Sequence, residues 1–420
     1  MQDMGQLEID NRCGHFRPED AQEELFSWLI NAGLSGSRVR DLFTEFCERL
    51  IGEGVMLKRA SITHSAIHPQ VSAFMYTWRR GEGLVTNTNF LHTDVPGEGW
   101  FASPFFYMLT NNITYLHRPL EEGSNLDFPV LVEFRDDGMT DWFSQAFEFG
   151  WGFENERLEH SAGVITSWAS DRPGGFSEEE FRILGRFIPV FGLAVKGIAS
   201  FRTARSVLET YIGRGTAGKV LSGQIRRGSV DSINAVLIHA DLKGFTSLSD
   251  TMPQEALIDM LDQYLDCMAR PIELANGEIL KFMGDGILAT FELPKTDPHE
   301  VQLACETALA TSRQMIGAVK ALNSKREAAG KPVMELDIAL HVGDVMYGNV
   351  GSENRLDFTV IGPAVNEVSR IEALCDVLES NLIASGDFVR LVRGADLGLT
   401  SCGMHELRGV REPIELFCER

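Results

Sequence analysis

Two aspartates, each at the end of a run that predicts a β-strand, are the residues of this chain best suited to chemistry. Asp241 closes the apolar run "AVLIHA", and Asp285 lies between two glycines in "KFMGDGILATF", residues 281–291. If their strands pair, the two carboxylates come within a few ångströms of each other. They then repel and raise each other's pKa unless a cation lies between them. Such a pair is typical of two-metal phosphoryl or nucleotidyl transfer.

Each aspartate alone also has a plainer interpretation. An Asp after a strand is often a helix N-cap, and "GDG" also describes a turn with a solvated carboxylate. After Asp241 the chain reads "LKGFTSLSD", which predicts a turn into a helix whose backbone N–H groups suit a polyphosphate. Gly244, Phe245 and Thr246 are therefore candidate substrate-binding residues.

The elements that must position these aspartates alternate between strands and helices over residues 231–420. A strand ends at Asp241, and a hairpin turns at "MGDG". Two long helices are predicted for "PQEALIDMLDQYLDCMARPIELA" and "EVQLACETALATSRQMIGAVKALNSKR", and a further strand pair for "MELDIALHVGDVMYGNVG". A third helix is predicted for "AVNEVSRIEALCDV" and a terminal hairpin for "HELRGVREPIELFCE".

Four segments of this region resemble the class III nucleotidyl cyclase catalytic domain in order and spacing. They are "HADLKGFTSLSD", "ILKFMGDGILATF", "RLDFTVIGPAVNEVSRIE" and "HELRGVREPIELF". The resemblance implies a ferredoxin-like α/β sandwich related to polymerase palm domains. It also implies that Asp241, Asp285 and the carbonyl of Leu242 hold two divalent metal ions, Mg²⁺ or Mn²⁺.

The same resemblance assigns five further residues. Lys281 matches the lysine that reads the adenine ring, and Thr359 stands at the second purine contact, where vertebrate adenylyl cyclases have an aspartate. Asn366 matches the residue that orients the ribose. Arg370, one helical turn later, matches the arginine that stabilises the transition state, and Arg408 matches a phosphate-binding basic residue. Each could also be an ordinary strand, cap or surface residue.

The implied activity is conversion of ATP to 3′,5′-cyclic AMP and pyrophosphate at a head-to-tail homodimer interface, where each site takes residues from both chains. One alternative is a guanylate cyclase, which Lys281 disfavours because guanine selectivity usually takes a Glu there. The other is a catalytically weak sensor and dimerisation protein. The GGDEF or GGEEF signature of diguanylate cyclases is absent.

The N-terminal half predicts an α+β sensor domain over residues 21–176, after a polar tail at 1–20. Helical periodicity covers roughly 20–60, and short β-prone runs with an antiparallel sheet cover 70–170, among them "SAFMYTW", "NITYLH", "FPVLVEF" and "AGVITSWA". The closing pattern "WASDRPGGFSEEEFRILGRFIPVFGLAVK" resembles the last strand and helix of a GAF domain. An unknown small molecule or protein is the expected signal.

A helical linker is predicted over residues 177–230. Ser177 and Glu180 form a capping box, and apolar residues then follow at steps of three and four from Phe181 to Ile198. This seam either packs on its own domain or forms a parallel dimer, which we favour. We expect it to be short because it meets Arg202 and Arg205. A glycine-rich connector, "GRGTAGKVLSGQIRRGS", completes the linker.

Composition and charge narrow the class of protein. The 420 residues carry a formal charge of −22, which argues against binding to nucleic acid or an anionic membrane. Pro189 and Lys196 interrupt the most apolar run, so we expect no membrane span and a cytoplasmic location. Seven scattered cysteines without a CxxC pair favour reduced thiols.

Several other residues are of types that bind cofactors or metal ions. Cys13, His15, His64 and His68 could hold haem or a bilin, but we expect surface residues. His341, Asp344 and Asp357 could be further metal ligands, and we assign them structural roles.

Overall fold

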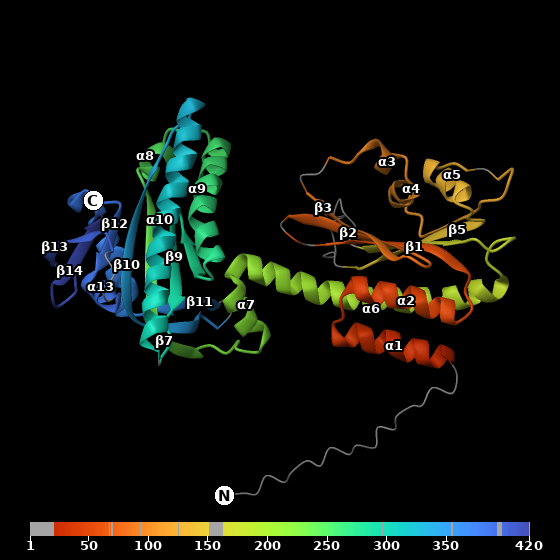
Figure 1. The fold of residues 1–420 in the computed structure, drawn as a ribbon, viewed down its shortest axis with the longest axis horizontal. Helices are drawn as coiled ribbons and strands as arrows, with labels where there is room; N and C mark the ends of the chain where they lie inside the picture. The colour runs from red at the N-terminus through yellow and green to blue at the C-terminus, as the bar shows by residue number, and fades with distance from the viewer. Residues whose placement is uncertain are drawn as a thin grey trace, which may run out of the picture. The chain divides into compact units, whose positions relative to one another are not determined.

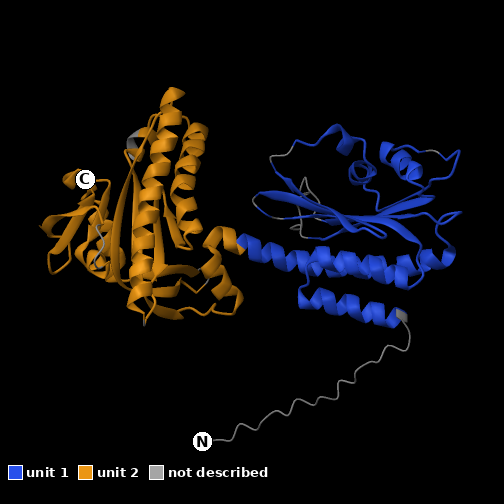
Figure 2. Cartoon of the chain, in the orientation of Figure 1, with its two compact units in different colours: residues 1–207 blue, residues 208–420 orange. Residues whose placement is uncertain are grey.

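The computed structural model describes residues 21–419, with gaps at 67, 69, 93–94, 125, 151–162, 296, 354–355 and 393–396. The chain divides into two compact units, residues 1–207 and 208–420 (Figure 2). Both units contain helices and a sheet, which confirms the predicted α+β class.

Unit 1 is built on one antiparallel sheet with the strand order β3-β2-β1-β6-β5-β4. Helices α2 and α6 pack on one face, around a core that includes Phe46 and Phe191, whose stacked rings are 4.6 Å apart. Helices α4 and α5 cover part of the other face (Figure 1). The elements are α1 Ala21–Ser35, α2 Val39–Gly52, β1 Leu57–Ser65, β2 Val71–Arg79, β3 Gly83–Leu91, α3 Glu98–Phe101, α4 Pro104–Thr110, β4 Tyr115–Pro119, α5 Pro129–Asp136, β5 Asp141–Glu148, β6 Gly163–Ser170 and α6 Glu178–Ile212.

Helix α6 begins as predicted but packs differently. The capping box is confirmed: the Ser177 hydroxyl accepts from the Glu180 N–H at 3.3 Å, and the Glu180 carboxylate accepts from the Ser177 N–H at 2.7 Å. The favoured dimer seam is wrong, because the residues from Leu184 to Ile198 on that stripe are buried in the core of unit 1. The helix is also not short, since its 35 residues include Pro189 and end at Ile212.

The length of α6 bears on the membrane prediction. By length and composition this helix could cross a membrane, and 56% of its apolar window is buried inside the structure. A core helix of a soluble protein passes the same test. The absence of a membrane span therefore stays a prediction, and the packing of α6 against the sheet explains why the helix is apolar.

Two other predictions for this half need correction. The run "FPVLVEF" was expected to be β-prone but forms helix α5, with Pro129 in its first turn and Leu131 and Phe134 buried three residues apart. His64 is not a surface residue, since it is only 5% exposed and burial lowers its pKa to about 4. His68 is a turn residue whose ring accepts from two backbone N–H groups. Cys13 and His15 lie outside the described residues.

Unit 2 has a mixed sheet in the order β13-β14-β12-β10-β7-β9-β8, and β11 pairs with β10. Its elements are α7 Arg214–Leu221, β7 Val230–Lys243, α8 Phe245–Ser249, α9 Gln254–Leu274, β8 Glu278–Met283, β9 Gly286–Glu292, α10 Pro298–Ala328, β10 Glu335–Gly351, β11 Leu356–Ile361, α11 Pro363–Glu372, α12 Cys375–Leu378, β12 Leu382–Ser385, α13 Gly386–Leu391, β13 Leu399–His405 and β14 Ile414–Glu419.

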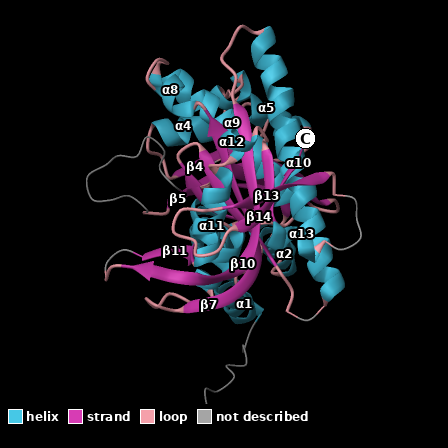
Figure 3. Ribbon diagram, turned by 90° about the vertical axis from the view of Figure 1, so that its left-hand side faces the viewer, coloured by secondary structure: helices cyan, strands magenta, loops and turns pink. Residues whose placement is uncertain are grey.

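The centre of unit 2 is the predicted ferredoxin-like sandwich. Strand β7, helix α9, hairpin β8–β9, helix α10 and strand β10 follow the β-α-β-β-α-β pattern. Helices α9 and α10 pack into the core on one face of the sheet, and α11 packs into the core on the other (Figure 3). This arrangement places the end of β7 beside the β8–β9 turn.

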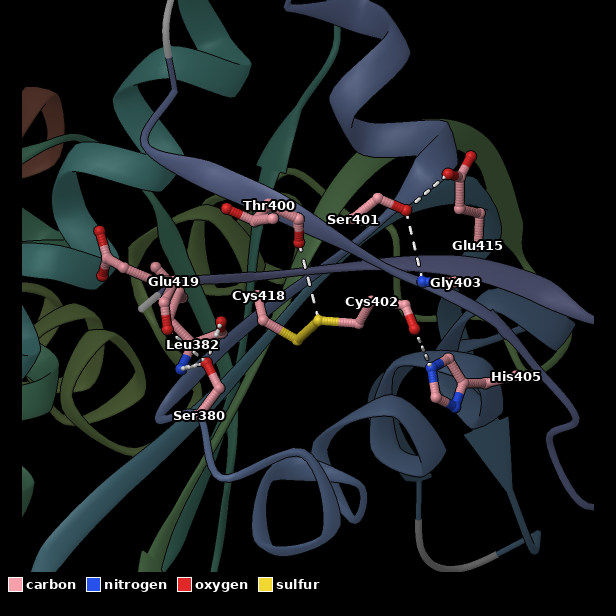
Figure 4. The surroundings of a disulfide bond; sticks show 10 residues. All are labelled: Ser380, Leu382, Thr400, Ser401, Cys402, Gly403, His405, Glu415, Cys418 and Glu419. Atoms are coloured by element: carbon pink, nitrogen blue, oxygen red, sulfur yellow. Dashed lines mark hydrogen bonds between the residues drawn. A yellow bond between two sulfur atoms is a disulfide. The ribbon is translucent and has the colours of Figure 1, made fainter.

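The cysteines do not all occur as free thiols. Cys402 and Cys418 form a disulfide between the paired strands β13 and β14, with Cα atoms 6.3 Å apart (Figure 4). The prediction of reduced thiols is therefore wrong for this pair. The four other described cysteines, Cys47, Cys267, Cys305 and Cys375, are free.

Candidate functional site

The two aspartates meet because β7 and β9 pair. Ala240 is opposite Ile287 in the antiparallel register, which places Asp241 next to the β8–β9 turn that carries Asp285. Gly286 makes room for this arrangement. A Cβ atom built there would lie 2.5 Å from Oδ1 of Asp241 and 2.9 Å from the carbonyl oxygen of Ala240. Any side chain at position 286 would therefore displace the Asp241 carboxylate.

The pKa of Asp241 shows how closely negative charge is gathered here. Burial raises this pKa to about 6, and the carboxylates of Asp285 and Asp337 add to the increase. Asp337 is the cross-strand neighbour of Asp241. Burial also raises the pKa of Asp285. The site thus brings together carboxylates that repel one another when they are ionised.

Glu372, at the end of α11, extends this cluster. Burial raises its pKa to about 7, with Asp241 the next largest cause and Asp285 a smaller one. Its only described ion-pair partner is the ring of His239, at 3.8 Å, and burial lowers the pKa of that histidine to about 4. A neutral imidazole does not offset the carboxylates.

The residues present fit a divalent cation. Neither Asp241 nor Asp285 has an ion-pair partner in the described part of the chain, and hard divalent cations prefer such oxygen ligands. Leu242, the third predicted ligand, follows Asp241 on β7 with its side chain buried, so only its main chain is suited to the role. Among the described residues no group of three or more His, Cys, Asp or Glu side chains has metal-binding geometry. The set is two carboxylates and a carbonyl.

This cluster predicts how metal and pH act on stability. In metal-free protein, folded Asp241 binds its proton more tightly than the unfolded chain does, because its pKa is raised from 3.8 to about 6. Its contribution to stability is therefore present below pH 3.8 and is lost as pH rises through about 6.

Mn²⁺ should reverse that loss. At a 100-fold excess over Kd we expect the midpoint of thermal unfolding at pH 7.5 to rise by about 5–10 °C. At pH 5 the increase should be much smaller, because Asp241 is then largely protonated. Differential scanning calorimetry with and without Mn²⁺ measures both shifts, and equal shifts at the two pH values would contradict this assignment.

The loop predicted to bind phosphate begins directly after β7. Gly244 has φ +87°, in the left-handed region that favours glycine, and it precedes α8. Phe245 packs partly against the core of unit 2 and anchors the loop. Thr246 lies in α8, and its side chain is outside the described residues.

Lys281 and Thr359 are brought to neighbouring strands. Lys281 Nζ on β8 lies 3.2 Å from Oδ2 of Asp357 on β11, and Thr359 is two residues further along β11, on the same face. Both members of the ion pair are more than half exposed, so the pair contributes at most about 1 kcal/mol. The lysine can therefore leave Asp357 for another partner at small cost.

Arg370 and Asn366 lie on α11, the helix that ends at Glu372. The Arg370 guanidinium faces the β13–β14 connection, where its Nη atoms are 3.7 Å from the position of a Cβ on Gly409. Arg408, the neighbour of Gly409, is exposed, as is Asn366. In the described part of the chain, no hydrogen bond or ion pair joins Arg370 or Asn366 to Asp241 or Asp285.

Two of the residues set aside have the structural roles predicted for them. His341 is buried between the Ser385 hydroxyl and the Glu367 carboxylate, each 2.9 Å from a ring nitrogen. Asp344 accepts a hydrogen bond of 2.8 Å from Asn234. Asp357 instead pairs with Lys281, and the sequence analysis missed this role. It also missed Glu372, although "SRIE" places a carboxylate two residues after Arg370.

The comparison with protein families covers this unit. Residues 229–418 match the model of the adenylate and guanylate cyclase catalytic domain. Residues 229–418 are a class III cyclase domain. This confirms the family that the four sequence segments indicate.

The cyclase domain also has named relatives. It is 31% identical over 149 residues to "Adenylate cyclase 1" of Rhizobium meliloti (strain 1021), covering 36% of this chain and 22% of the relative. It is 34% identical over 170 residues to "Adenylate cyclase" of Anabaena cylindrica, covering 40% and 32%. The match thus spans less than a third of the length of each of these relatives.

Among solved structures, the adenylyl cyclase CyaB from P. aeruginosa is similar, with 27% identity, a TM-score of 0.41, and coverage of 45% of this chain and 95% of that chain. The guanylyl cyclase Cya2 is similar at 28% identity and a TM-score of 0.39, with coverage of 45% and 92%.

Proposed function

We propose that this protein is an adenylate cyclase that converts ATP to 3′,5′-cyclic AMP and pyrophosphate. One observation carries the proposal: in a domain of the cyclase family, Asp241 and Asp285 meet at the end of β7 without a neutralising cation from the described part of the chain. A substrate with a metal-bound triphosphate supplies the missing positive charge.

Each predicted residue has a defined part in this reaction. Asp241, Asp285 and the carbonyl of Leu242 would hold two divalent ions, which when bound lower the pKa of the 3′-hydroxyl and neutralise the α-phosphate. The N–H groups of the turn at Gly244 bind phosphate oxygens. Lys281 and Thr359 contact the adenine, and Asn366 orients the ribose.

The transition state gathers negative charge on the phosphate oxygens as the ATP 3′-hydroxyl attacks the α-phosphate and pyrophosphate leaves. Arg370 neutralises this charge, and a preorganised donor of this kind contributes about 3–4 kcal/mol. Arg408 binds a further phosphate oxygen. No covalent intermediate is needed.

The direct test is product identification. Purified protein is incubated with ATP or GTP and with Mn²⁺ or Mg²⁺, and the nucleotide product is separated and identified by mass spectrometry. Cyclic AMP as the main product supports the proposal. Cyclic GMP as the main product would make the protein a guanylate cyclase, and no cyclic nucleotide with either metal would contradict both.

Base selection gives a sharper prediction at Lys281. Lys281→Glu should lower kcat/KM for ATP about tenfold or more, because an acceptor then faces the adenine N1 acceptor. The new carboxylate would also face Asp357, which now pairs with the lysine. Steady-state kinetics with both nucleotides measure the effect.

Lys320→Glu is the matched control for Lys281→Glu, since Lys320 is exposed on the distant helix α10. It makes the same charge change and should leave both kinetic constants unchanged. Unchanged ATP kinetics in Lys281→Glu would show that this lysine does not contact the base.

We also infer that the active site is completed by a second copy of the chain. Large apolar side chains are exposed on β8, β10 and β11, close to Lys281: they are Phe282, Met283, Met346, Leu356 and Ile361. Such patches mark protein interaction surfaces. A homodimer that covers this patch could bring Arg370 and Asn366 of one chain to the aspartates of the other.

Unit 1 is proposed to regulate this activity through α6 and α7, and its GAF-like identity stays a prediction. Helix α7 is fixed to the cyclase domain by a buried network. The Tyr347 hydroxyl lies 2.5 Å from that of Thr216 and donates to Glu278 at 2.8 Å. The Thr216 N–H also donates to Glu278, which lies on β8 three residues before Lys281. A shift of α7 would thus move the strand that carries the base contact.

Tyr347→Phe tests this connection. Removing the hydroxyl leaves Thr216 and Glu278 with one partner fewer, so we expect a destabilisation of about 1–3 kcal/mol and a change of several-fold in KM for ATP. The measurements are urea unfolding and steady-state kinetics of the full chain.

Tyr264→Phe is the matched control, because its hydroxyl also bridges buried partners, at 2.6 Å from Asn323 Oδ1 and 3.0 Å from the Met334 N–H, but in the α9–α10 core. It should lower stability to a similar degree without changing KM. Equal kinetic effects of the two variants would mean that α7 does not act through β8.

A further inference from the structure

Unit 1 contains a cavity of about 180 Å³ between its sheet and helix α4. Strands β1, β5 and β6 form one wall, with Thr63 and Ala146 among its residues. Trp100, Phe105 and Met108 form the opposite wall. An apolar cavity of about 150 Å³ is large enough to bind benzene. This one can hold one ring or two fused rings.

The lining decides which charge a ligand can have. It is mainly aromatic and aliphatic, and it includes no Lys, Arg or His among the described residues. Among the described lining residues the one charged member is Glu148, which is exposed. An anion would therefore lose its hydration without gaining a cationic partner from these described residues, so the lining favours an uncharged ligand.

One polar group in the wall lacks a partner. The Thr63 hydroxyl oxygen is buried from solvent and has no hydrogen bond to any described residue. An unpaired buried hydroxyl is unfavourable, and such groups in native structures normally have a partner. The neighbouring Ser65 hydroxyl differs, since it accepts from the Gly163 N–H at 2.7 Å. Thr63 is thus the group that can pair with a ligand, once rotation about χ1 turns its hydroxyl toward the cavity.

Strand β5 of the cavity wall also contacts the helix that leaves unit 1. Phe147 lines the cavity, and its ring lies 3.2 Å from the position that a Cβ on Gly192 of α6 would occupy. This close contact depends on a glycine. The Phe147 ring packs on the α6 face of β5, whereas the neighbouring Ala146 belongs to the cavity side, so strand β5 lies between the cavity and α6.

We propose that this cavity is a binding site for an uncharged aromatic molecule of one or two fused rings, which hydrogen-bonds to the Thr63 hydroxyl. This goes beyond the proposed cyclase activity and does not depend on it. Indole is a suitable probe, because it has the right size and one N–H donor. Indene has the same shape without that donor.

Isothermal titration calorimetry of the full chain with both probes tests the proposal. Indole should bind the wild type about three- to tenfold more tightly than indene, because only indole can use the Thr63 hydroxyl. Thr63→Val should remove this preference. Thr86→Val is the matched control: Thr86 lies on β3, outside the lining, and its replacement should keep the preference.

A second variant fills the space. Ala146→Phe should abolish binding of both probes, and its midpoint of thermal unfolding shows whether the chain still folds. Indole-3-acetate and cyclic AMP, both anions, should not compete with indole. Absence of indole binding at millimolar concentration, competition by either anion, or an unchanged preference in Thr63→Val would overturn the proposal. The Asp241→Asn chain should bind indole normally, which separates this site from the cyclase activity.

Discussion

Asp241→Asn and Asp285→Asn should each lower cyclase turnover about a thousandfold or more. Metal ions at such a site stabilise transition-state charge by several kcal/mol, and each 1.36 kcal/mol is a factor of ten in rate. The fold should survive, because each change removes a charge from a cluster whose carboxylates already repel one another. In metal-free buffer at pH 7.5 the midpoint of thermal unfolding should stay equal or rise.

Asp337→Asn separates loss of a metal ligand from loss of charge. Asp337 is opposite Asp241 in the sheet and contributes to its raised pKa, but its own Oδ1 accepts from Asn381 at 2.7 Å. Removing this charge should leave turnover within about tenfold of wild type. Substantial Mn²⁺-dependent turnover in Asp241→Asn or Asp285→Asn would contradict the assignment of these residues. A loss in all three variants of equal size would point to charge alone.

The two aspartates could be located from sequence because their positions depend on local signals. Asp241 ends an apolar run, and "MGDG" between two strand patterns predicts a hairpin turn. Pairing of these strands then brings the carboxylates together. Gly286 also indicates the site in the sequence, since a glycine at the start of a strand is typical of a close approach by another group. Here that group is Asp241.

The packing of helix α6 could not be predicted from sequence, because the same apolar pattern is compatible with two structures. The apolar stripe from Leu184 to Ile198 suits a dimer seam and a helix buried on its own sheet equally well. Which of the two structures forms depends on whether the domain offers an apolar surface on which the helix can pack. Here Phe43 and Phe46, which are distant in sequence, form part of that surface.

The surroundings of Lys281 also depend on long-range contacts, which the sequence alone does not reveal. Asp357 meets Lys281 only because β11 pairs with the far end of β10 and so comes next to β8. In the same way, the helix at "FPVLVEF" follows from tertiary burial of Leu131 and Phe134 in a run that local propensity favours as a strand. In this chain the residue types indicate the candidate site residues, whereas the pairing of distant strands determines which residues they contact.

Mixing two inactive variants should restore activity if each site is shared between chains. Asp241→Ala and Arg370→Ala homodimers each lack an essential group in both sites. In a mixed dimer, one site collects both substitutions, while the other receives Asp241 from one chain and Arg370 from the other. Random exchange of equal amounts makes half of the dimers mixed, each with one intact site of two. Recovery should therefore approach roughly a quarter of wild-type activity.

The control for this experiment mixes Asp241→Ala with Asp285→Ala. These residues meet within one chain, so a mixed dimer has no intact site, and no recovery is expected after the same exchange. Fluorescence energy transfer between labelled chains shows that exchange has occurred. No recovery with Arg370→Ala after proven exchange would mean that each site is completed within one chain. That result would also require the Arg370 side chain to turn from Gly409 toward the two aspartates. Recovery in the first mixture alone would support the homodimer and assign Asp241 and Arg370 to opposite halves of one site.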